Sequence, residues 1–311
     1  MAIPQRKKIA LVGAGNIGGT LALLAAAKQL GDIILFDVVE GLPQGKALDI
    51  SHAVPILGSS VSVRGTNDYK DLAGADVCII TAGLARKPGM SRDDLIGKNS
   101  QIMTQVAHGI RDNAPDSFVV VVSNPLDAMV TLCQRETGFP HNKVVGMAGV
   151  LDSVRYRAFL AEETGLSPVS INAFVLGGHG DDMVPVRSYT TAQGIPISKL
   201  VSAEKLDAIE KRVRCAGGEV VALLKTGSAF CSPAAAALEM TESYLLDQKK
   251  VLPCAAFLNG EYGHTGIYMG VPVVIGKNGV ERVIDIDLSP TEKQALDVSA
   301  GKVRELISCI P

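Results

Sequence analysis

The stretch Gly13-Ala14-Gly15-Asn16-Ile17-Gly18 constrains this chain more than any other, because it fits the pattern G-x-G-x-x-G. A short apolar run, Lys7 to Val12, precedes it, and an Ala- and Leu-rich helical pattern follows from Ile17 to Lys28. Strand, tight turn and helix in this order predict a dinucleotide-binding unit whose helix N-terminus holds a pyrophosphate. In such a unit the first glycine allows the turn, the second lets the backbone approach the phosphates, and the third lets helix and strand pack closely.

A carboxylate at the end of the next strand supports this prediction and selects the nucleotide. The apolar run Ile33 to Phe36 ends in Asp37, about 20 residues after the last glycine of the motif, where an acid that binds the ribose is expected. Its charge favours the ribose hydroxyls of NAD and repels the extra phosphate of NADP. The motif alone leaves open a glycine-rich turn that binds no ligand.

Further apolar runs predict how the unit continues. Continuous hydrophobic stretches return between helical patterns at 76–81, 118–122 and 144–147, and a short strand is expected at 61–63. Buried strands of this kind predict an α/β fold with a doubly wound parallel sheet of the Rossmann type. A length of 311 residues suits two domains. We expect an NAD-binding domain over residues 1–147 and an α+β substrate-binding and catalytic domain over residues 148–311.

The second half of the chain mixes helices with strands. The patterns predict helices at 151–163, 203–226 and 233–246, a strand at 169–176, and antiparallel strands at 251–258, 271–275 and 280–284. Ser289-Pro290-Thr291-Glu292 predicts the start of the last helix, with Ser289 as N-cap, a proline in the first turn and Glu292 completing a capping box.

Composition argues against several classes of partner. Lys and Arg number 30 and Asp and Glu number 32, for a net charge of −2, so neither nucleic acid nor an anionic membrane is favoured as a partner. No apolar run approaches the ~18 residues of a membrane span, and Ile9 to Val12 is too short for a signal peptide, so we expect a cytoplasmic protein. The six scattered cysteines are interpreted as reduced and mostly buried, and no Cys or His spacing indicates a metal site.

A loop with two neighbouring cations follows the strand at 76–81. Residues 84–90 read Leu-Ala-Arg-Lys-Pro-Gly-Met, and Ser91 with Asp94 forms a capping-box pattern for a helix. Arg92 therefore falls in the first turn of that helix, where a cation opposes the helix dipole. Glycine and proline suit a lid that closes over a site, although a solvated surface loop fits the same pattern.

Three further sets of polar residues lie where a parallel sheet binds ligands or just beyond it. Asn124 follows the strand at 118–122, Asp152 and Arg155 share one helix face, and His179 lies among three glycines. Each set also allows a plainer interpretation: Asn124 as a helix cap, Asp152 with Arg155 as a surface ion pair, and His179 as a turn residue.

Taken together, these motifs resemble the lactate/malate dehydrogenase family over essentially the whole chain. The resemblance is carried by the glycine motif at 13–18, Asp37, the loop 86–92 (Arg-Lys-Pro-Gly-Met-Ser-Arg), Asn124-Pro125, Leu151-Asp152-Ser153-Val154-Arg155 and Gly177-Gly178-His179-Gly180. Within the family, the loop 86–92 is most similar to that of malate-oxidising members of the lactate-dehydrogenase-like group. The resemblance also implies a homodimer or homotetramer.

The resemblance implies a role for each matching position. For catalysis it implies His179 as the acid/base and Asp152 as the carboxylate that orients it. For the substrate it implies contacts from Arg86, Arg92, Asn124 and Arg155. For NAD it implies contacts from Gly13, Ala14, Gly15, Asn16, Ile17, Gly18, Asp37, Asn99, Val122, Ser123 and Asn124.

The chemistry of these residue types agrees with the implied roles. Histidine titrates near the working pH and can take a hydroxyl proton while a hydride moves to NAD. The guanidinium of Arg155 can hold a carboxylate through two parallel hydrogen bonds. Arg86 could pair with a second carboxylate, and a substrate without one would leave its charge unpaired at a cost of about 3–5 kcal/mol. We therefore expect oxidation of (S)-malate, a dicarboxylate, to oxaloacetate.

Two alternatives stay open, and two positions depart from the family pattern. The alternatives are a dehydrogenase for lactate or another 2-hydroxy acid, and an NAD-binding sensor without catalysis. Ala85 stands where malate-oxidising members usually have proline, which bears on loop mobility. Cys231-Ser232 replaces an aromatic and a small residue, which bears on the packing behind the site.

Overall fold

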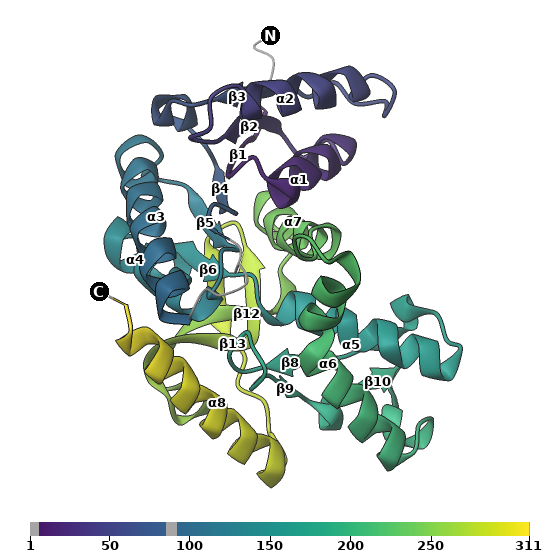
Figure 1. The fold of residues 1–311 in the computed structure, drawn as a ribbon. Coiled ribbons are helices and arrows are strands. Elements are labelled where there is room, and N and C mark those ends of the chain that lie inside the picture. The colour runs from purple at the N-terminus through teal and green to yellow at the C-terminus, as the bar shows by residue number, and fades with distance from the viewer. Residues whose placement is uncertain (1–5, 85–91, 311) are drawn as a thin grey trace.

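The chain folds around one long twisted sheet (Figure 1). The computed structural model describes residues 6–84 and 92–310, without the side chains of residues 92–94. Within these residues the sheet has nine strands in the order β14-β13-β12-β6-β5-β4-β1-β2-β3. Its parallel strands are β1 (Lys8–Val12), β2 (Asp32–Phe36), β3 (Val63–Thr66), β4 (Val77–Ile80), β5 (Phe118–Val121) and β6 (Val144–Gly146). The prediction of a doubly wound parallel sheet is confirmed.

Helices cover both faces of this sheet, as Figure 1 shows. Alternate residues of the strands point to two separate cores: Ile9 and Leu11 of β1 pack in one, Ala10 and Val12 in the other. The first core includes side chains of α1 (Asn16–Ala27), α2 (Leu42–Ala53), α5 (Gly149–Thr164) and α7 (Cys231–Leu245). The second includes side chains of α3 (Arg92–Asn113) and α4 (Leu126–Thr137), while α8 (Pro290–Ser308) contributes to both cores. Burial on both faces explains why these strands are continuously apolar.

The second half of the chain extends the same sheet in antiparallel fashion. Its strands are β12 (Lys250–Asn259), β13 (Thr265–Gly276) and β14 (Gly279–Val283), as expected from the sequence. β12 joins β6 by pairing Ala255 with Gly146, where any side chain at Gly146 would press on the Ala255 methyl group. The predicted division at residues 147 and 148 falls between β6 and α5, and it stays a prediction.

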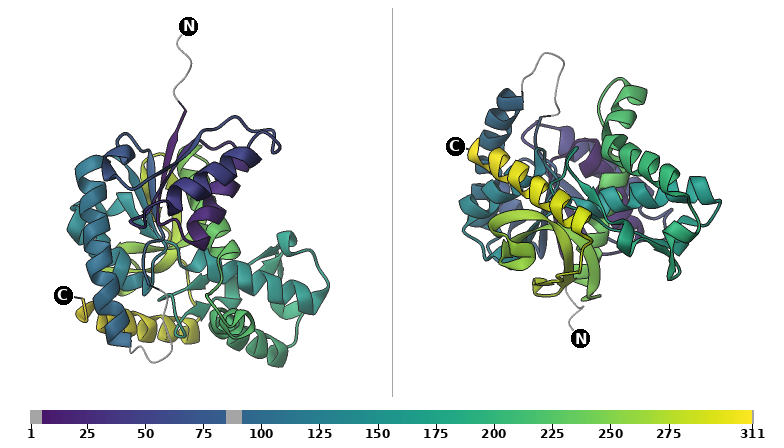
Figure 2. Two further views of the ribbon diagram at one scale, coloured as in Figure 1. Left: turned by 45° about the horizontal axis from the view of Figure 1, so that its top comes forward. Right: turned by 90° about the horizontal axis from the view of Figure 1, so that it is seen from below.

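The rest of the second half packs partly against this extension, as α8 and β8 do, and partly against α5, as α6 does. α6 (Ala203–Leu224) and α8 lie on the lower side of the molecule in Figure 1, and Figure 2 shows α8 running across its underside. The short strands β7 (Ile171–Asn172), β8 (Val175–Leu176), β9 (Val184–Pro185), β10 (Thr191–Ala192) and β11 (Ile195–Pro196) form two small sheets. Ser289 caps α8, and Glu292 completes the predicted capping box.

Two strand predictions need correction. The strand expected at 61–63 begins at Val63 and runs to Thr66, because pairing with β2 fixes its register from Ile33 to Phe36. The single strand expected at 169–176 is instead a turn followed by β7 and β8, which pair with β10 and β9 in different sheets. Apolar continuity cannot reveal such a break, since apolar residues are buried on either side of it, Ile171 in β7 and both residues of β8.

The cysteine prediction is half right. Cys78, Cys133 and Cys254 are buried, but Cys215, Cys231 and Cys309 are exposed, and all six are free thiols. The exposed cysteines lie on helices or just beyond a helix end, and one face of a surface helix is exposed to solvent.

Candidate active site

The glycine motif forms the tight turn between β1 and α1. Gly13 has a left-handed φ of +117°, and a Cβ there would lie 2.6 Å from Thr81 Oγ1. A Cβ on Gly18 would lie only 1.9 Å from the Gly13 carbonyl oxygen. Gly15 differs: its φ of −68° suits any residue, and among the described residues no heavy atom beyond its chain neighbours lies within 4 Å of a Cβ built there. Two glycines are therefore required by packing, while the third leaves open space beside the N-terminus of α1.

Asp37 lies directly beside this turn. Its Oδ2 accepts a hydrogen bond from the Ala14 amide at 2.7 Å, and its Oδ1 accepts one from the Val39 amide at 3.0 Å. These bonds hold the carboxylate at the mouth of the turn with lone pairs to spare for hydroxyl groups. Open space at Gly15, free helix amides and a fixed carboxylate fit the pyrophosphate and ribose of NAD.

The ends of β4 and β5 bring further groups to the same edge of the sheet. Val122 and Ser123 follow β5 and are buried, and Ser123 Oγ donates to the Ala82 carbonyl oxygen at 2.5 Å. Asn124 follows them and is exposed at the rim of a cavity. The carboxyl ends of parallel strands meet at one edge of a sheet, which explains why these positions converge on the glycine turn.

Asn99 of α3 joins two of these chain segments. Its side chain is buried, its Oδ1 accepts from the Leu84 amide at 2.8 Å, and its Nδ2 donates to the carbonyl oxygens of Leu84 and Asn124 at 3.1 and 2.7 Å. The amide is thus fully occupied by backbone groups. Its contact with NAD stays a prediction, and the structure adds that Asn99 ties the start of the loop at 84 to Asn124.

A buried carboxylate links the histidine and the arginine of the second half. Asp152 is only 1 % exposed. Its Oδ2 lies 2.7 Å from Nδ1 of His179, and its Oδ1 accepts from Nη1 of Arg155 at 3.1 Å. Asp152 and Arg155 project from one face of α5, whereas His179 lies just after β8. The ion pair is therefore not a solvated surface pair, and the histidine is not merely a turn residue.

This arrangement fixes the tautomer and charge of the imidazole. A hydrogen bond from Nδ1 to Asp152 leaves Nε2 as the nitrogen that can exchange a proton with a ligand. Burial opposes protonation of His179, but the charge of Asp152, their hydrogen bond and the charge of Asp127 outweigh it, so the pKa of His179 is raised above its usual value. The carboxylate of Asp152 therefore stabilises the protonated ring, the form that donates a proton from Nε2.

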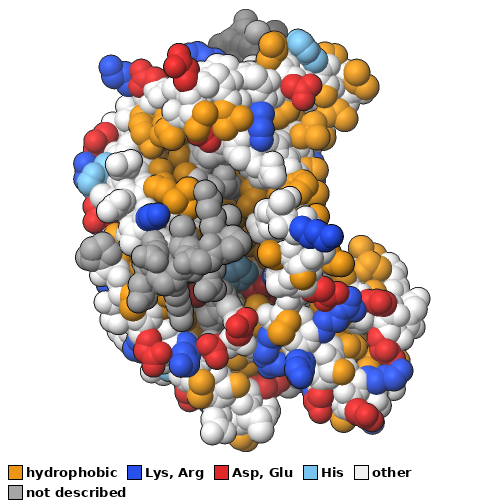
Figure 3. Space-filling view, viewed as in Figure 1, with side chains coloured by type: hydrophobic (Ala, Val, Ile, Leu, Met, Phe, Trp, Pro, Cys, Tyr) orange, Lys and Arg blue, Asp and Glu red, His pale blue; other side chains and the backbone are white. Residues whose placement is uncertain are grey.

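Arg155 and His179 of the second half open onto the same cavity as Asn124 of the first half. The cavity has a volume of about 320 Å³, and its lining includes Asn124, Arg155 and His179. Figure 3 shows the molecule hollowed between the part that carries α1 and α2 and the part that carries α6. A space of this size suits a small organic acid beside a nicotinamide.

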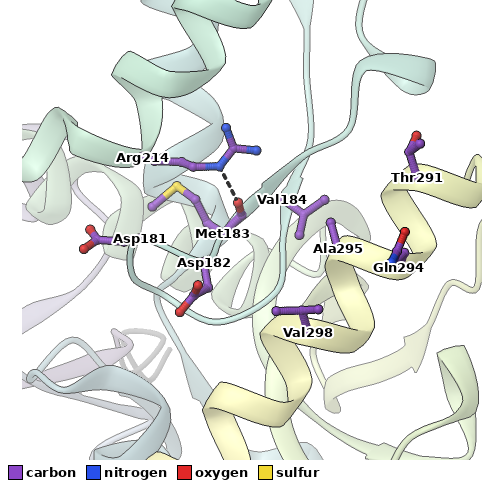
Figure 4. Close-up of a pocket in the computed structure, with 9 residues that line it drawn as sticks. All are labelled: Asp181, Asp182, Met183, Val184, Arg214, Thr291, Gln294, Ala295 and Val298. Atoms are coloured by element: carbon purple, nitrogen blue, oxygen red, sulfur yellow. Dashed lines mark hydrogen bonds between the residues drawn. The ribbon is translucent and has the colours of Figure 1, made fainter.

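Arg214 of α6 forms the wall between this cavity and a second one of about 350 Å³. Figure 4 shows its guanidinium above Met183, whose carbonyl oxygen accepts from Nε at 3.1 Å. Asp181 and Asp182 lie on the same loop as Met183 and line the second cavity, whose other wall is formed by Thr291 and further residues of α8. Arg214 thus tethers the loop that follows His179.

Two predicted substrate contacts cannot be placed. Arg86 lies outside the described residues, as does Ala85, and so does the side chain of Arg92, although its backbone begins α3. The Ser91 capping box also lies outside them. Their proposed roles continue to rest on the sequence.

Sequence reasoning missed three residues that hold the histidine loop. Asp127, Ser299 and Arg214 all contact the backbone between Gly178 and Met183. Asp127 carried a signal, an acid two residues after Pro125, but its place in a first helical turn concealed it as an ordinary dipole partner. Ser299 and Arg214 carried no signal, because their contacts join distant parts of the chain.

Two features are absent from the described part of the chain. No group of three or more His, Cys, Asp and Glu side chains there could hold a metal ion. Within the same residues, no helix combines the length and apolarity that crossing a membrane requires.

Comparison with known proteins agrees with this geometry. Residues 7–146 match the NAD-binding domain of lactate/malate dehydrogenases, and residues 149–310 match their α/β C-terminal domain. Malate dehydrogenase 2 of Anaeromyxobacter dehalogenans is 60% identical over 98% of this chain and 99% of its own.

Two solved structures from Cryptosporidium parvum share the whole fold. Its lactate dehydrogenase, complexed with lactic acid and nicotinamide adenine dinucleotide, is 46% identical with a TM-score of 0.96, and 99% of each chain is covered. Its malate dehydrogenase is 45% identical with a TM-score of 0.96, covering 98% of this chain and 99% of that one.

The fold and site define an NAD-dependent dehydrogenase with a histidine and a buried carboxylate beside a small-acid cavity. The two matched domains place it further, since together they span nearly all of the sequence. The chain belongs to the lactate/malate dehydrogenase family. The expectation of NAD as the cofactor is thereby confirmed.

Substitutions at the glycines of the turn should affect different properties, NADH binding at Gly15 and stability at Gly18. Gly15→Ala should leave the melting temperature unchanged but weaken NADH binding roughly tenfold or more, a loss of about 1.4 kcal/mol, because a methyl group fills the phosphate space. Gly18→Ala should destabilise the protein by about 1–3 kcal/mol through overpacking. Calorimetry and NADH titration measure both. Tight NADH binding by Gly15→Ala would contradict a phosphate site at this turn.

Proposed function

We propose that this chain is an NAD-dependent malate dehydrogenase that interconverts (S)-malate and oxaloacetate. The observation that carries the proposal is the Asp152 carboxylate, which contacts both His179 and Arg155 at the cavity. A relative whose name states this activity is 60% identical over almost the whole chain. Bound NAD supplies the hydride acceptor, or the donor in the reverse direction.

Arg155 binds and orients the substrate in this mechanism. Its guanidinium has five N–H donors, of which one goes to Asp152. The remaining donors form the two parallel bonds that hold the C1 carboxylate. Asn124 hydrogen-bonds the substrate from the sheet edge, and the proposal places Arg92 over the reacting oxygen when the loop closes.

His179 moves the proton. In malate oxidation, neutral Nε2 takes the hydroxyl proton while Asp152 stabilises the imidazolium that forms. In oxaloacetate reduction, the imidazolium returns this proton to the carbonyl oxygen. Asp152, through its charge and its hydrogen bond, raises the pKa of His179 despite burial, so the imidazolium that donates this proton is stabilised.

Arg86 selects the dicarboxylate. Its charge would pair with the second carboxylate of oxaloacetate, whereas pyruvate would leave a desolvated guanidinium without a partner. The lactate dehydrogenase with a TM-score of 0.96 keeps lactate as the rival substrate, because the backbone does not distinguish the two activities. Side chains at the cavity must therefore set the choice.

Replacing the proposed acid/base separates an enzyme from an NAD-binding sensor. His179→Ala should lower kcat by at least about 10²- to 10⁴-fold, the usual contribution of general acid–base catalysis, while NADH affinity persists. His52→Ala, an exposed histidine on α2, is the matched control and should keep full turnover. Turnover of His179→Ala at the wild-type rate would refute the mechanism.

Substrate choice tests Arg86. The ratio of kcat/KM for oxaloacetate to that for pyruvate should be about a hundred to several thousand, since a buried unpaired charge costs on the order of 3–5 kcal/mol. Arg86→Gln should lower this ratio by at least about a hundredfold. NADH absorbance measures both. A wild-type ratio near one would mean that Arg86 does not face the substrate.

The proposal includes a homodimer or homotetramer in the cytoplasm. Large apolar side chains are exposed on and just after α2, including Leu48 and Ile56, the latter 88 % exposed. An apolar patch of this kind suits an interface between copies. Six free cysteines suit a reducing compartment.

Light scattering tests the assembly. The molar mass should be two or four times that of one 32.5 kDa chain, and Ile56→Glu should shift it towards the monomer. A monomeric wild-type protein at micromolar concentration would exclude this part of the proposal.

A further inference from the structure

A second buried carboxylate lies beside the proposed acid/base and has no part in the mechanism above. Asp127 is in the first turn of α4 and is only 3 % exposed. Its Oδ2 accepts a hydrogen bond from the backbone N–H of His179 at 2.9 Å. Its Oδ1 is buried and has no hydrogen-bond partner among the described residues. No arginine or lysine pairs with it in that part of the chain.

The loop around His179 is held at consecutive positions by different elements. Gly177 pairs with Gly270 of β13, and the Gly178 amide donates to Ser299 Oγ of α8 at 2.9 Å. The next amide, that of His179, donates to Asp127. The neutral Ser299 hydroxyl therefore accepts a hydrogen bond from the Gly178 amide just as the Asp127 carboxylate does from the His179 amide.

A neutral acceptor would therefore be enough to bind the His179 amide, and the charge of Asp127 is not needed for this hydrogen bond. A buried ionised carboxylate with one free oxygen is unfavourable for folding. Burial raises the pKa of Asp127 to about 6, against hydrogen bonding from the His179 amide and attraction to its imidazole. The group is still largely ionised at neutral pH. A costly charge beside a proposed catalytic group is the arrangement expected where function, not stability, retains it.

We infer that Asp127 is a positioning residue for the reaction: it fixes the backbone of His179 and, with Asp152, favours the imidazolium form. The inference rests on the proposed function in assigning His179 the proton transfer. Two carboxylates then act on His179 from different helices: Asp152 of α5 contacts the imidazole, and Asp127 of α4 contacts the backbone N–H and adds its charge nearby. Arg155 opposes them, and Asp181 and Arg214 also line the cavity.

The first test is a neutral isostere. Asp127→Asn keeps an oxygen for the His179 amide and removes only the charge, so the kinetic pKa of the acid/base should fall by about one pH unit. Because reduction needs the imidazolium and oxidation the neutral ring, the effects should be opposite. Above the wild-type pKa, kcat/KM for oxaloacetate should drop about tenfold, whereas below it, kcat/KM for malate should rise.

Ser299→Ala is the matched control. It removes the hydroxyl that holds the neighbouring Gly178 amide, and no charge, so it should disturb the loop without moving the kinetic pKa. Asp127→Ser offers a second neutral acceptor, should Asp127→Asn fail to fold. A purely structural role for Asp127 predicts unchanged pKa values in all three variants, and that result would overturn the inference.

A direct titration separates this inference from the proposed function. The chain has five histidines, so NMR of isotope-labelled histidine can follow each ring, with His179→Ala identifying the signal of interest. In the Asp127→Asn variant without ligands, the His179 ring should titrate at lower pH than in the wild-type protein. If wild type turned over neither malate nor oxaloacetate, the proposed function would fail, yet this titration would still decide whether Asp127 acts on the imidazole.

Discussion

The close contact between Gly13 and Gly18 is the constraint on which the rest of the site depends. With 1.9 Å between a Gly18 Cβ position and the Gly13 oxygen, helix α1 starts immediately against the end of β1. This places unpaired helix amides at the carboxyl edge of the sheet, where Asp37 and Asn124 also emerge. A larger residue at either glycine would push the helix away and leave the edge without its phosphate site.

The second half of the site depends on the extension of the same sheet. β12 and β13 continue the sheet beyond β6, and the Gly177 bridge to Gly270 carries the histidine loop on this extension. Asp152 approaches from α5, which begins right after β6. Cofactor edge and proton-transfer group are thus mounted on one continuous support, which suits a reaction that needs accurate distances between two bound molecules.

Local signals in the sequence predicted what local physics controls. The glycine turn, the buried parallel strands and the Ser289 cap follow from neighbouring residues, and the fold class was predicted correctly for that reason. The contacts of Asp127, Ser299 and Arg214 join elements far apart in the chain, and the hydrophobic periodicity of the sequence does not predict them. The break between β7 and β8 escaped for the same reason, because their partners β10 and β9 decide where each strand ends.

Backbone similarity does not settle which 2-hydroxy acid is used, since a lactate and a malate dehydrogenase both match this fold with a TM-score of 0.96. The proton chemistry at His179 is also common to both reactions. Selectivity must then come from a group that meets only the second carboxylate, and on the sequence that group is Arg86. In the proposed mechanism the two carboxylates near His179 would set how readily the proton moves, whereas Arg86 would set which 2-oxo acid is reduced, so the two properties could change independently.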